Sequence, residues 1–432
     1  MIASPAGRVA YVMKRYPRLT ETFILNEIRA MERLGADLAI FSLLPPEPPP
    51  HHPMVAEVAA PVFPVPMAAP GDWWRLLAAH ARVCAAAPLR YAGAAARAAW
   101  WSVQAPTPLS VWKQFARAAF VATTCRTQNI RHIHAHFANA PAAVARFASL
   151  MSGIPFSFTA HAKDLYLTPK RVIQRRARAA TFVATCTGYN AAYLRDLLGP
   201  ADSGKINLVY HGIDLSHFSV RRSAVRGTPP LILSVGRLVP KKGHDDLIEA
   251  CALLRDGGQA FRCMIVGAGE LRDELAARIA RHGLEQVVTL EGAMTHADLI
   301  ELYRRADVFA LAPRIAENGD RDGIPNVIAE AMAIGVPVVS IDMSGIPEVI
   351  RHDTTGLLVP PHDPAALAEA ISRLIDDPEH AAALAAGARK LLEGDFDLWT
   401  TTKHLYKLMG CAGCAIAQAT LDSNLPIGKS AE

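Results

Sequence analysis

A stretch of twelve residues, 322–333, carries two carboxylates, Asp322 and Glu330, eight positions apart. A Gly-Ile-Pro turn between them opens a helix, because proline suits the first helical position, where its missing N–H group costs nothing. A helix start presents free N–H groups and the positive end of the helix dipole, which favour a phosphate. Glu330, about a turn and a half later, lies within reach of a ligand held there. An ordinary helix with a surface carboxylate at each end is the alternative. The candidate anion site at the helix start comprises Gly323, Ile324, Pro325, Asn326 and Val327.

Two earlier loops add cations and glycines. Arg237 and Lys242 follow an expected strand over 231–235, and cations on such a loop suit a diphosphate, although ordinary surface charge is the alternative. Gly267 and Gly269 end the next expected strand, over 261–266. This turn has two glycines of the dinucleotide fingerprint, but Arg272 stands where the third glycine belongs, which argues against a dehydrogenase.

Histidines follow or occupy two strands of the N-terminal half. His161 comes at the carboxyl end of an expected strand over 156–159, where side chains of parallel sheets point into the ligand crevice. A hydrogen-bonded structural histidine is the alternative. His132, His134 and His136 alternate along another strand and would share a face. We expect no metal site there, because no neighbouring carboxylate or cysteine completes a ligand set.

Short apolar runs alternate with helix-favouring segments along the whole chain of 432 residues. This alternation predicts an α/β protein with two Rossmann-like, doubly wound parallel-sheet domains. Residues 221–230 are polar and basic and end in Thr-Pro-Pro, which predicts an interdomain linker. The expected divisions are an N-terminal domain over 1–220, a C-terminal domain over 231–395, a helix over 396–410 that packs back on the first domain, and a tail over 411–432.

The segment 71–128 is basic and rich in tryptophan. No acidic residue occurs between Asp72 and Asp164, and this interval contains ten lysines and arginines, so it carries a charge of +10. Since the net charge of the whole chain is +5, the rest of the chain carries −5. Arginines with tryptophans on Ala-rich helices suit an anionic membrane surface, although a solvated basic face over core tryptophans is the alternative. On one continuous helix the arginines would share a side, although Pro88 interrupts it. The expected membrane-facing residues are Arg75, Arg82, Arg90, Arg97, Trp73, Trp74, Trp100 and Trp101.

Cysteine use and hydropathy indicate the compartment. The seven cysteines are scattered, which argues against a disulfide framework and fits a reducing environment. Cys411 and Cys414 form a lone CxxC pair in the tail. No signal peptide and no membrane-spanning apolar run are expected. We therefore expect a cytoplasmic protein, peripheral on the inner face of the cytoplasmic membrane.

The combination of these motifs resembles the GT4 family of retaining, nucleotide-sugar-dependent glycosyltransferases with the GT-B fold, over about residues 7–410. The N-terminal motifs resemble the subgroup that builds bacterial exopolysaccharides, including colanic-acid type enzymes. The resemblance implies two Rossmann-like domains that face each other across a cleft. Its motifs are Gly236-Arg237-Leu238 with Lys242-Gly243, Val266 to Glu270, Asp322 to Val339, Lys14 to Pro17, Thr20 to Phe23, His134 to Phe137 and Phe158 to His161.

The resemblance also implies a role for each candidate residue. Arg237 and Lys242 neutralise the donor diphosphate, assisted by the helix start, so that neither a metal nor another cofactor is expected. Asp322 holds the donor sugar, Glu330 holds the ribose, and His161 lies near the anomeric centre. Thr20 and Glu21 contact the acceptor. The implied partners are a UDP- or GDP-sugar, a saccharide acceptor that is lipid-linked, and an anionic membrane surface, with no nucleic acid. Retention then needs no enzymatic nucleophile.

Three departures from the family pattern affect the expected specificity. Asp322 replaces the usual glutamate, an eight-residue insert occupies 314–321, and the glycine-rich acceptor loop is absent near Tyr16. Two alternatives therefore stay open. One is a nucleotide-sugar epimerase of the same fold, and the other is a non-catalytic scaffold that binds nucleotide sugars.

Overall fold

The computed structural model describes residues 7–18, 21–49, 51–66, 71–221 and 227–410. Contacts divide the chain into two compact units. The first unit holds the chain up to Thr159, Ala179–Val183 and, among described residues, 402–410. The second unit holds Ala160–Arg178 and Ala184–Thr401. The expected domain boundaries stay a prediction, and residues 222–226 of the expected linker and the tail at 411–432 lie outside the described residues.

The N-terminal half forms a seven-stranded sheet in the order β3-β2-β1-β4-β5-β6-β7. The neighbours from β3 to β5 pair in parallel. Because β1 lies between β2 and β4, the order reverses at β1, as in doubly wound folds. The strands are β1 (Arg8–Arg15), β2 (Leu38–Leu44), β3 (Val62–Pro64), β4 (Ile130–His136), β5 (Phe156–Ala160), β6 (Val183–Thr185) and β7 (Ile206–Leu208).

Two short elements lie in the proline-rich stretch 45–70, although its prolines favour an extended loop. They are β3 and a 3-10 helix, η1 (Pro53–Glu57). Strand β3 lies at the edge of the sheet, where Pro64 is tolerated because an edge strand has one side without ladder bonds.

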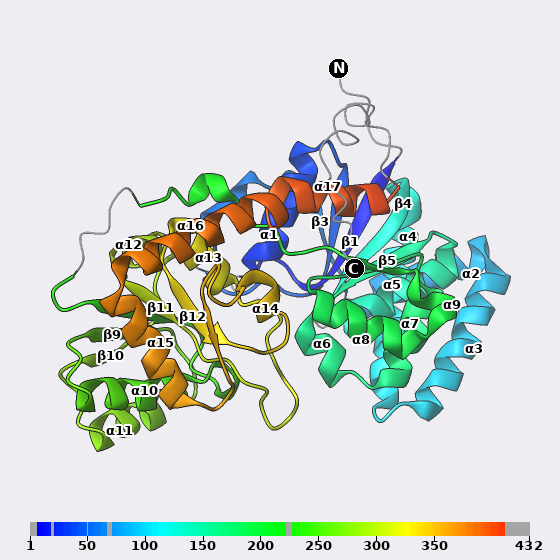
Figure 1. Cartoon of the computed structure of the whole chain (residues 1–432). Coiled ribbons are helices and arrows are strands. Elements are labelled where there is room, and N and C mark those ends of the chain that lie inside the picture. Colours follow the sequence, from blue (N-terminus) through cyan, green and yellow to red (C-terminus); the bar gives the residue numbers. More distant parts are fainter. Residues whose placement is uncertain (1–6, 19–20, 50, 67–70, 222–226, 411–432) are drawn as a thin grey trace. The chain divides into compact units, whose positions relative to one another are not determined.

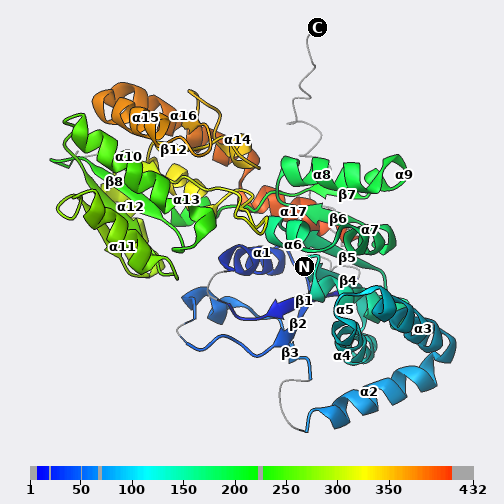
Figure 2. The ribbon, with the colours of Figure 1, turned by 90° about the horizontal axis from the view of Figure 1, so that it is seen from below.

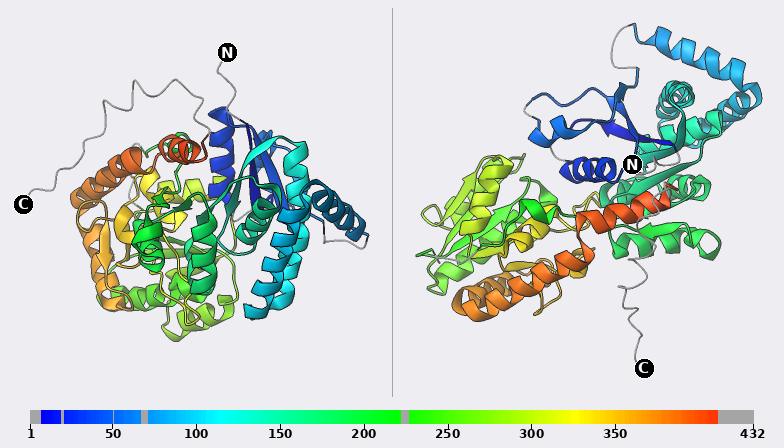
Figure 3. Two further views of the ribbon diagram at one scale, coloured as in Figure 1. Left: turned by 90° about the vertical axis from the view of Figure 1, so that its right-hand side faces the viewer. Right: turned by 90° about the horizontal axis from the view of Figure 1, so that it is seen from above.

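Helices of the first unit pack in successive layers on its sheet. Helices α4 (Pro108–Thr127) and α5 (Ala140–Ser152) contact β4, and α5 also contacts β1. Helices α2 (Trp73–Ala86) and α3 (Pro88–Gln104) pack on α4, so they lie at the margin of this unit (Figures 2 and 3). Helix α1 (Thr22–Arg33) follows β1, and α17 (Leu398–Leu408) confirms the helix expected near the C-terminus.

The C-terminal half forms a six-stranded sheet in the order β10-β9-β8-β11-β12-β13. All of its neighbouring strands pair in parallel. The order again reverses, at β8, which creates a second switch point for a ligand. The strands are β8 (Leu231–Val235), β9 (Arg262–Val266), β10 (Val288–Glu291), β11 (Val308–Ala310), β12 (Val338–Ile341) and β13 (Leu357–Val359).

Both faces of this sheet are covered by helices (Figure 1). Successive strand residues alternate between two apolar cores: Ile232 belongs to one core and Leu233 to the other. Strands buried on both faces must read as continuous apolar runs, which is why the sequence predicts them well. The first core takes in α10 (His244–Asp256), α11 (Arg272–Arg281) and α15 (Pro364–Asp376). The second takes in α12 (His296–Arg305), α13 (Asn326–Ile334), α14 (Ile346–Val349) and α16 (Pro378–Asp395).

The remaining helices of the second unit follow the last strands of the seven-stranded sheet. They are α6 (Ala162–Leu167), α7 (Lys170–Ala179), α8 (Gly188–Leu198) and α9 (Pro200–Ser203). Within the described residues, no helix is both long and apolar enough to cross a membrane.

Candidate functional site

Four charged side chains gather where the β8 loop meets the segment before α13, and we call them the lysine–aspartate cluster: Lys241, Lys242, Asp320 and Asp322. Lys242 Nζ lies 2.6 Å from one carboxylate oxygen of Asp322, and Lys241 Nζ lies 3.0 Å from the other. Lys241 also lies 3.1 Å from Asp320 Oδ1. The structure thus brings the predicted residues Lys242 and Asp322 into direct contact. Lys241 and Asp320 were missed, because nothing in a local pattern indicates a pairing across 79 positions.

Asp322 is ionised throughout the neutral range. Burial alone would raise the pKa of its carboxyl, but the ammonium groups of Lys242 and Lys241 outweigh burial and lower this pKa to about 2. Since the ionised carboxylate only accepts hydrogen bonds, Asp322 is suited to receive them from the hydroxyls of a sugar.

The predicted helix start is present, shifted by one residue. Helix α13 begins at Asn326, and Pro325 is its N-cap in extended conformation rather than its first helical residue. With the helix start one residue later, an anion site is still expected there, because the first N–H groups of the helix lack intrahelical partners. A Cβ on Gly323 would lie 3.1 Å from the Thr187 side chain and 3.9 Å from Cys186 Sγ. The turn therefore packs closely on the segment after β6.

Glu330 lies on α13, one turn beyond that start, and is the second predicted carboxylate. The hydroxyl of Tyr303 donates to it at 3.3 Å. Burial raises the pKa of Glu330 to about 7, and the Tyr303 hydrogen bond only partly opposes this effect. A ligand hydroxyl that donates to Glu330 would favour its carboxylate form.

Gly267 and Gly269 allow two loops to touch. A Cβ on Gly267 would lie 1.9 Å from the carbonyl oxygen of Gly236, and one on Gly269 would lie 2.2 Å from that of Leu238. Leu238 N–H donates to the carbonyl of Ala268 at 3.0 Å. Loop packing therefore accounts for both glycines, and their contact with a donor stays a prediction. Arg237 is exposed on the same loop and forms no ion pair within the described residues.

His161 lies where the sequence places it, directly after β5, and it caps α6. Its side chain is buried, and its backbone N–H donates to Asp164 at 3.0 Å. A Cβ on Gly323 would lie 4.0 Å from Cβ of Ala162, the residue after His161. Within the second unit, the end of β5 and the turn after Asp322 are therefore neighbours.

The half-buried carboxylate of Glu348 makes several hydrogen bonds that the sequence did not reveal. Its carboxylate accepts hydrogen bonds from the N–H groups of Gly188 at 2.6 Å and Tyr189 at 2.9 Å, and from the Tyr210 hydroxyl at 2.9 Å. A carboxylate at the N-terminus of α8 is favourable because it meets free N–H groups and the positive helix end. This contact links α14 to α8 within the second unit.

The three histidines of β4 are held by side chains of the neighbouring strand β5 and of helix α1. His132 and His134 both contact Ser157 Oγ at 2.7 Å, and His136 contacts Glu27 at 3.1 Å. Burial, and then the neighbouring histidines, lower the pKa of His134 well below its ordinary value. Among the described residues, the group that comes close enough to hold a metal is His161, Cys186 and His211 and does not include these histidines.

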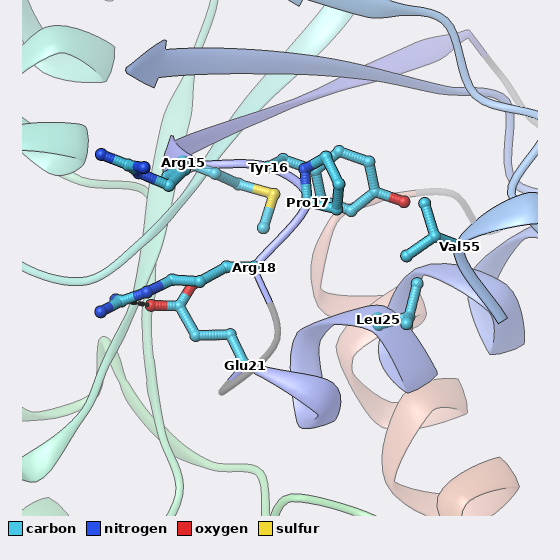
Figure 4. A pocket seen from close by; sticks show the side chains of 8 residues that line it. Arg15, Tyr16, Pro17, Arg18, Glu21, Leu25 and Val55 are labelled. Carbon is cyan, nitrogen blue, oxygen red and sulfur yellow. Dashed lines mark hydrogen bonds and ion pairs between the residues drawn. The ribbon is translucent and has the colours of Figure 1, made fainter. Parts of the chain in front are cut away.

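The predicted acceptor residues are only partly described, because Thr20 lies outside the described residues. Glu21 is the N-cap of α1 and is buried, with one carboxylate oxygen 2.5 Å from Arg18. Burial raises the pKa of Glu21, which Arg18 opposes. Both residues line a small pocket after β1, together with Tyr16 and Val55 (Figure 4). A role of Glu21 toward an acceptor stays a prediction.

The basic, tryptophan-bearing segment confirms one expectation and requires one correction. Helix α2 ends at Ala86 and α3 begins at Pro88, so the interruption expected at Pro88 is present and the four arginines do not lie on one continuous helix. Trp101 is buried, packs on Phe147 and lies under the guanidinium of Arg146. Trp73, Trp74 and Trp100 are exposed, by 49%, 64% and 64%. All four arginines are exposed as well.

Known families match both halves of the chain. A model described as Glycosyltransferase Family 4 matches residues 83–217, and one described as Glycosyl transferases group 1 matches residues 217–391. The chain belongs to the glycosyltransferases. The lysine–aspartate cluster, α13 and the glycine loops of this glycosyltransferase all lie in the second matched region.

Relatives agree with this assignment. WcaL of Escherichia coli (strain K12), whose name describes a colanic acid biosynthesis glycosyltransferase, is 38% identical over 206 residues. That match spans 48% of this chain and about half, 51%, of the relative. WcaL of Salmonella typhimurium is 27% identical over 425 residues, which cover 93% of this chain and 99% of the relative.

Solved structures confirm the expected fold. HepE of Anabaena in complex with UDP superposes with a TM-score of 0.68 at 20% identity, over 93% of this glycosyltransferase and 98% of HepE. At this identity the likeness concerns the fold. The two Rossmann-like parallel-sheet domains expected from the sequence are those of GT-B glycosyltransferases.

Proposed function

We propose that this glycosyltransferase transfers a sugar from a UDP- or GDP-sugar to a lipid-linked saccharide during exopolysaccharide biosynthesis, with retention of the anomeric configuration. The observation that carries the proposal is the Asp322 carboxylate held by two lysine ammonium groups next to the start of α13. The names of the relatives support the pathway, and the UDP in the HepE complex supports the class of donor.

In this proposal, cationic side chains of the protein neutralise the donor diphosphate in place of a metal ion. Lys242 turns from Asp322 toward the donor diphosphate, and exposed Arg237 joins it. Lys241 stays with Asp320 and Asp322, so each aspartate keeps a cationic partner while Lys242 is engaged. Fixed positive charge and the helix start stabilise the diphosphate as it leaves. No metal ion is therefore required for transfer.

Each of the two carboxylates contacts a different part of the nucleotide-sugar donor. Ionised Asp322 accepts hydrogen bonds from the sugar hydroxyls, and Glu330 accepts them from the ribose. His161, next to the turn at Gly323, contacts the sugar near the anomeric centre. Retention without an enzymatic nucleophile, with the leaving phosphate deprotonating the acceptor, follows from the resemblance to GT4 enzymes. Thr20 and Glu21 are proposed to contact the acceptor.

A membrane surface completes the proposal. Within the described residues, more than half of the exposed large apolar side chains lie between Trp73 and Trp112, on α2, α3 and α4. Exposed patches of this kind mark interaction surfaces, and arginines with tryptophans suit anionic lipid headgroups. We propose that this surface binds the inner face of the cytoplasmic membrane, where a lipid-linked acceptor is available.

Calorimetric titration of the purified chain with a panel of UDP- and GDP-sugars, in metal-free buffer, tests the proposal. One donor should bind, and Lys242→Ala should abolish this binding, whereas Lys390→Ala on the exposed side of α16 should not change it. Failure of every donor to bind would overturn the proposal. Product analysis with the bound donor separates the alternatives: an epimerase converts the donor without acceptor, and a scaffold leaves it unchanged.

A further inference from the structure

Three potential metal ligands meet at the carboxyl ends of neighbouring strands. His161 directly follows β5, Cys186 directly follows β6, and His211 comes three residues after β7. One ligand atom from each lies within 4.8 Å of the others. The rings of His161 and His211 are 5.0 Å apart between centroids. Because β5, β6 and β7 are neighbours in the sheet, the backbone itself brings the three side chains together.

The distances between the three ligand atoms allow tetrahedral coordination of a metal ion after small side-chain rotations. Zinc bonds of about 2.0–2.1 Å to nitrogen and about 2.3 Å to sulfur place neighbouring ligand atoms roughly 3.3–3.6 Å apart. The three atoms must therefore approach one another by about 1 Å. His161 and Cys186 are buried and His211 is half-buried, so the ion would be partly shielded from water. A ligand set of one thiolate and two imidazoles prefers Zn²⁺ over Mg²⁺, Ca²⁺ or Mn²⁺.

The surrounding charges favour a cation. The carboxylates of Asp164 and Glu348 lie close enough to Cys186 to interact with it electrostatically, and they would attract a metal ion. Binding replaces the S–H bond with a metal–sulfur bond and releases one proton to the buffer, so the charge of the ion is partly neutralised in place.

We propose that His161, Cys186 and His211 form a Zn²⁺ site that inhibits the glycosyltransferase when it is occupied. The inhibitory role rests on the proposed function, because it requires that His161 contacts the donor sugar. A histidine bound to Zn²⁺ no longer offers its lone pair or its N–H group to the donor. Cys186 also lies next to Gly323 in the turn after Asp322, so an ion there adjoins the proposed donor position.

Cobalt spectroscopy tests the site without any assay of activity. The full chain carrying Cys411→Ser and Cys414→Ser, which removes the CxxC pair, is titrated with Co²⁺. One equivalent should produce thiolate-to-cobalt charge-transfer absorption, and Zn²⁺ should abolish it. Cys186→Ser should eliminate this absorption and weaken Zn²⁺ binding by about tenfold or more. Exposed Cys84→Ser is the matched control and should change neither. Equal Zn²⁺ affinity with and without Cys186 would overturn the site.

Further variants separate a ligand from a structural residue. His211→Asn, at a half-buried position, should also weaken Zn²⁺ binding by about tenfold, with an unchanged melting temperature in the absence of metal. If Cys186→Ser does not fold, His211→Asn alone decides the matter in the same way. Unchanged Zn²⁺ affinity in a folded His211→Asn protein would overturn the ligand set.

The inhibitory role has its own measurement. Zn²⁺ should reduce transferase activity of the wild-type chain reversibly, with full recovery on chelation, and Mg²⁺ at the same concentration should not. Cys186→Ser should require about tenfold more Zn²⁺ for half-inhibition. Activation by Zn²⁺, or equal inhibition of both proteins, would overturn this role. If no donor is ever transferred, the proposed function fails, while the cobalt spectra still decide whether the metal site exists.

Discussion

Lys242 and Asp322 form an ion pair of 2.6 Å although 80 positions separate them in the chain. Lys241 holds the second oxygen of the same carboxylate at 3.0 Å. Lys242 can therefore leave Asp322 to contact a ligand, because Asp322 still has Lys241 as a cationic partner. Removal of one partner from a buried pair is costly because a charge is left uncompensated, and the second lysine lowers that cost here. The proposed contacts to the diphosphate and to the sugar thus come from adjacent groups of opposite charge.

Asp322→Asn tests this division of labour. We expect kcat/KM for the preferred donor to fall at least about tenfold, because a hydrogen bond to a charged group contributes about 1.5–3 kcal/mol. Affinity for the free nucleoside diphosphate should not weaken, because Lys242 is released from its ion pair. Steady-state kinetics and calorimetry measure both quantities. Asp320→Asn, which leaves the pair of Lys242 and Asp322 intact, should change kcat/KM much less. Equal kcat/KM for Asp322→Asn and wild type would refute the assignment.

If Glu330 holds the ribose, donor binding should depend on pH. Burial raises the pKa of Glu330 to about 7, and the proposed hydrogen bonds from ribose hydroxyls require the carboxylate form. Below this pKa the proton must leave before the donor binds, so affinity falls with decreasing pH and is constant well above the pKa. We expect about tenfold weaker binding at pH 6 than at pH 8, measured by calorimetry.

Glu330→Gln is the control for this pH dependence, because the donor diphosphate and other groups also titrate. The variant should bind weakly at both pH values, with little remaining dependence on pH. If the wild-type chain and the Glu330→Gln chain show the same pH profile, Glu330 does not hold the ribose.

The loop contact at Gly269 gives a prediction about stability. A Cβ there would meet the Leu238 carbonyl oxygen at 2.2 Å, and backbone atoms cannot move aside as a flexible side chain does. Gly269→Ala should lower the free energy of unfolding by about 2 kcal/mol, as overpacking does elsewhere. Gly292→Ala, where no described atom lies within 4 Å of the added Cβ, should stay within about 0.5 kcal/mol of wild type. Urea denaturation measures both, and equal midpoints would show that the loops separate easily.

The sequence predicts the sheets well because their strands are buried on both faces. Such strands appear as short apolar runs, and the helices between them keep their own period, so both halves can be read as parallel α/β units. Strand β3 was missed because it lies in a proline-rich stretch and itself contains Pro64, which only an edge strand accepts. Its place beside β2 follows from pairing, which a local pattern does not contain.

Contacts between side chains were harder to predict from the sequence than helices and strands. Lys241 looked equivalent to its neighbour Lys242, yet Lys241 is buried between Asp320 and Asp322, two aspartates from a distant part of the chain. Trp101 could have been recognised: with Ala94 and Ala98 it forms a stripe at helical spacing, and all three are buried. Trp100 falls on the opposite side and is exposed. The zinc ligands have no local motif, since each follows a different strand.

Chelation should leave transfer intact. Because Lys242, Arg237 and the start of α13 supply the positive charge, treatment with EDTA should not reduce the initial rate with the preferred donor. Readdition of Mg²⁺ or Mn²⁺ should not raise it. An initial rate assay on metal-depleted protein measures this. Complete loss of activity on chelation, with recovery on addition of a divalent ion, would contradict the proposal that the protein alone neutralises the diphosphate.

The surface formed by α2 and α3 should determine membrane binding. Replacement of Arg75, Arg82, Arg90 and Arg97 by glutamine should release the protein from anionic vesicles, since each cation near such a surface contributes about 1 kcal/mol. Cosedimentation measures the bound fraction. A charge-matched control replaces four exposed arginines of the second unit, at 262, 272, 281 and 305, and should stay bound. Trp73→Ser with Trp100→Ser should also weaken binding, including at high salt, because the apolar contribution is not screened. Equal cosedimentation of the α2–α3 variant and the control would place the membrane contact elsewhere.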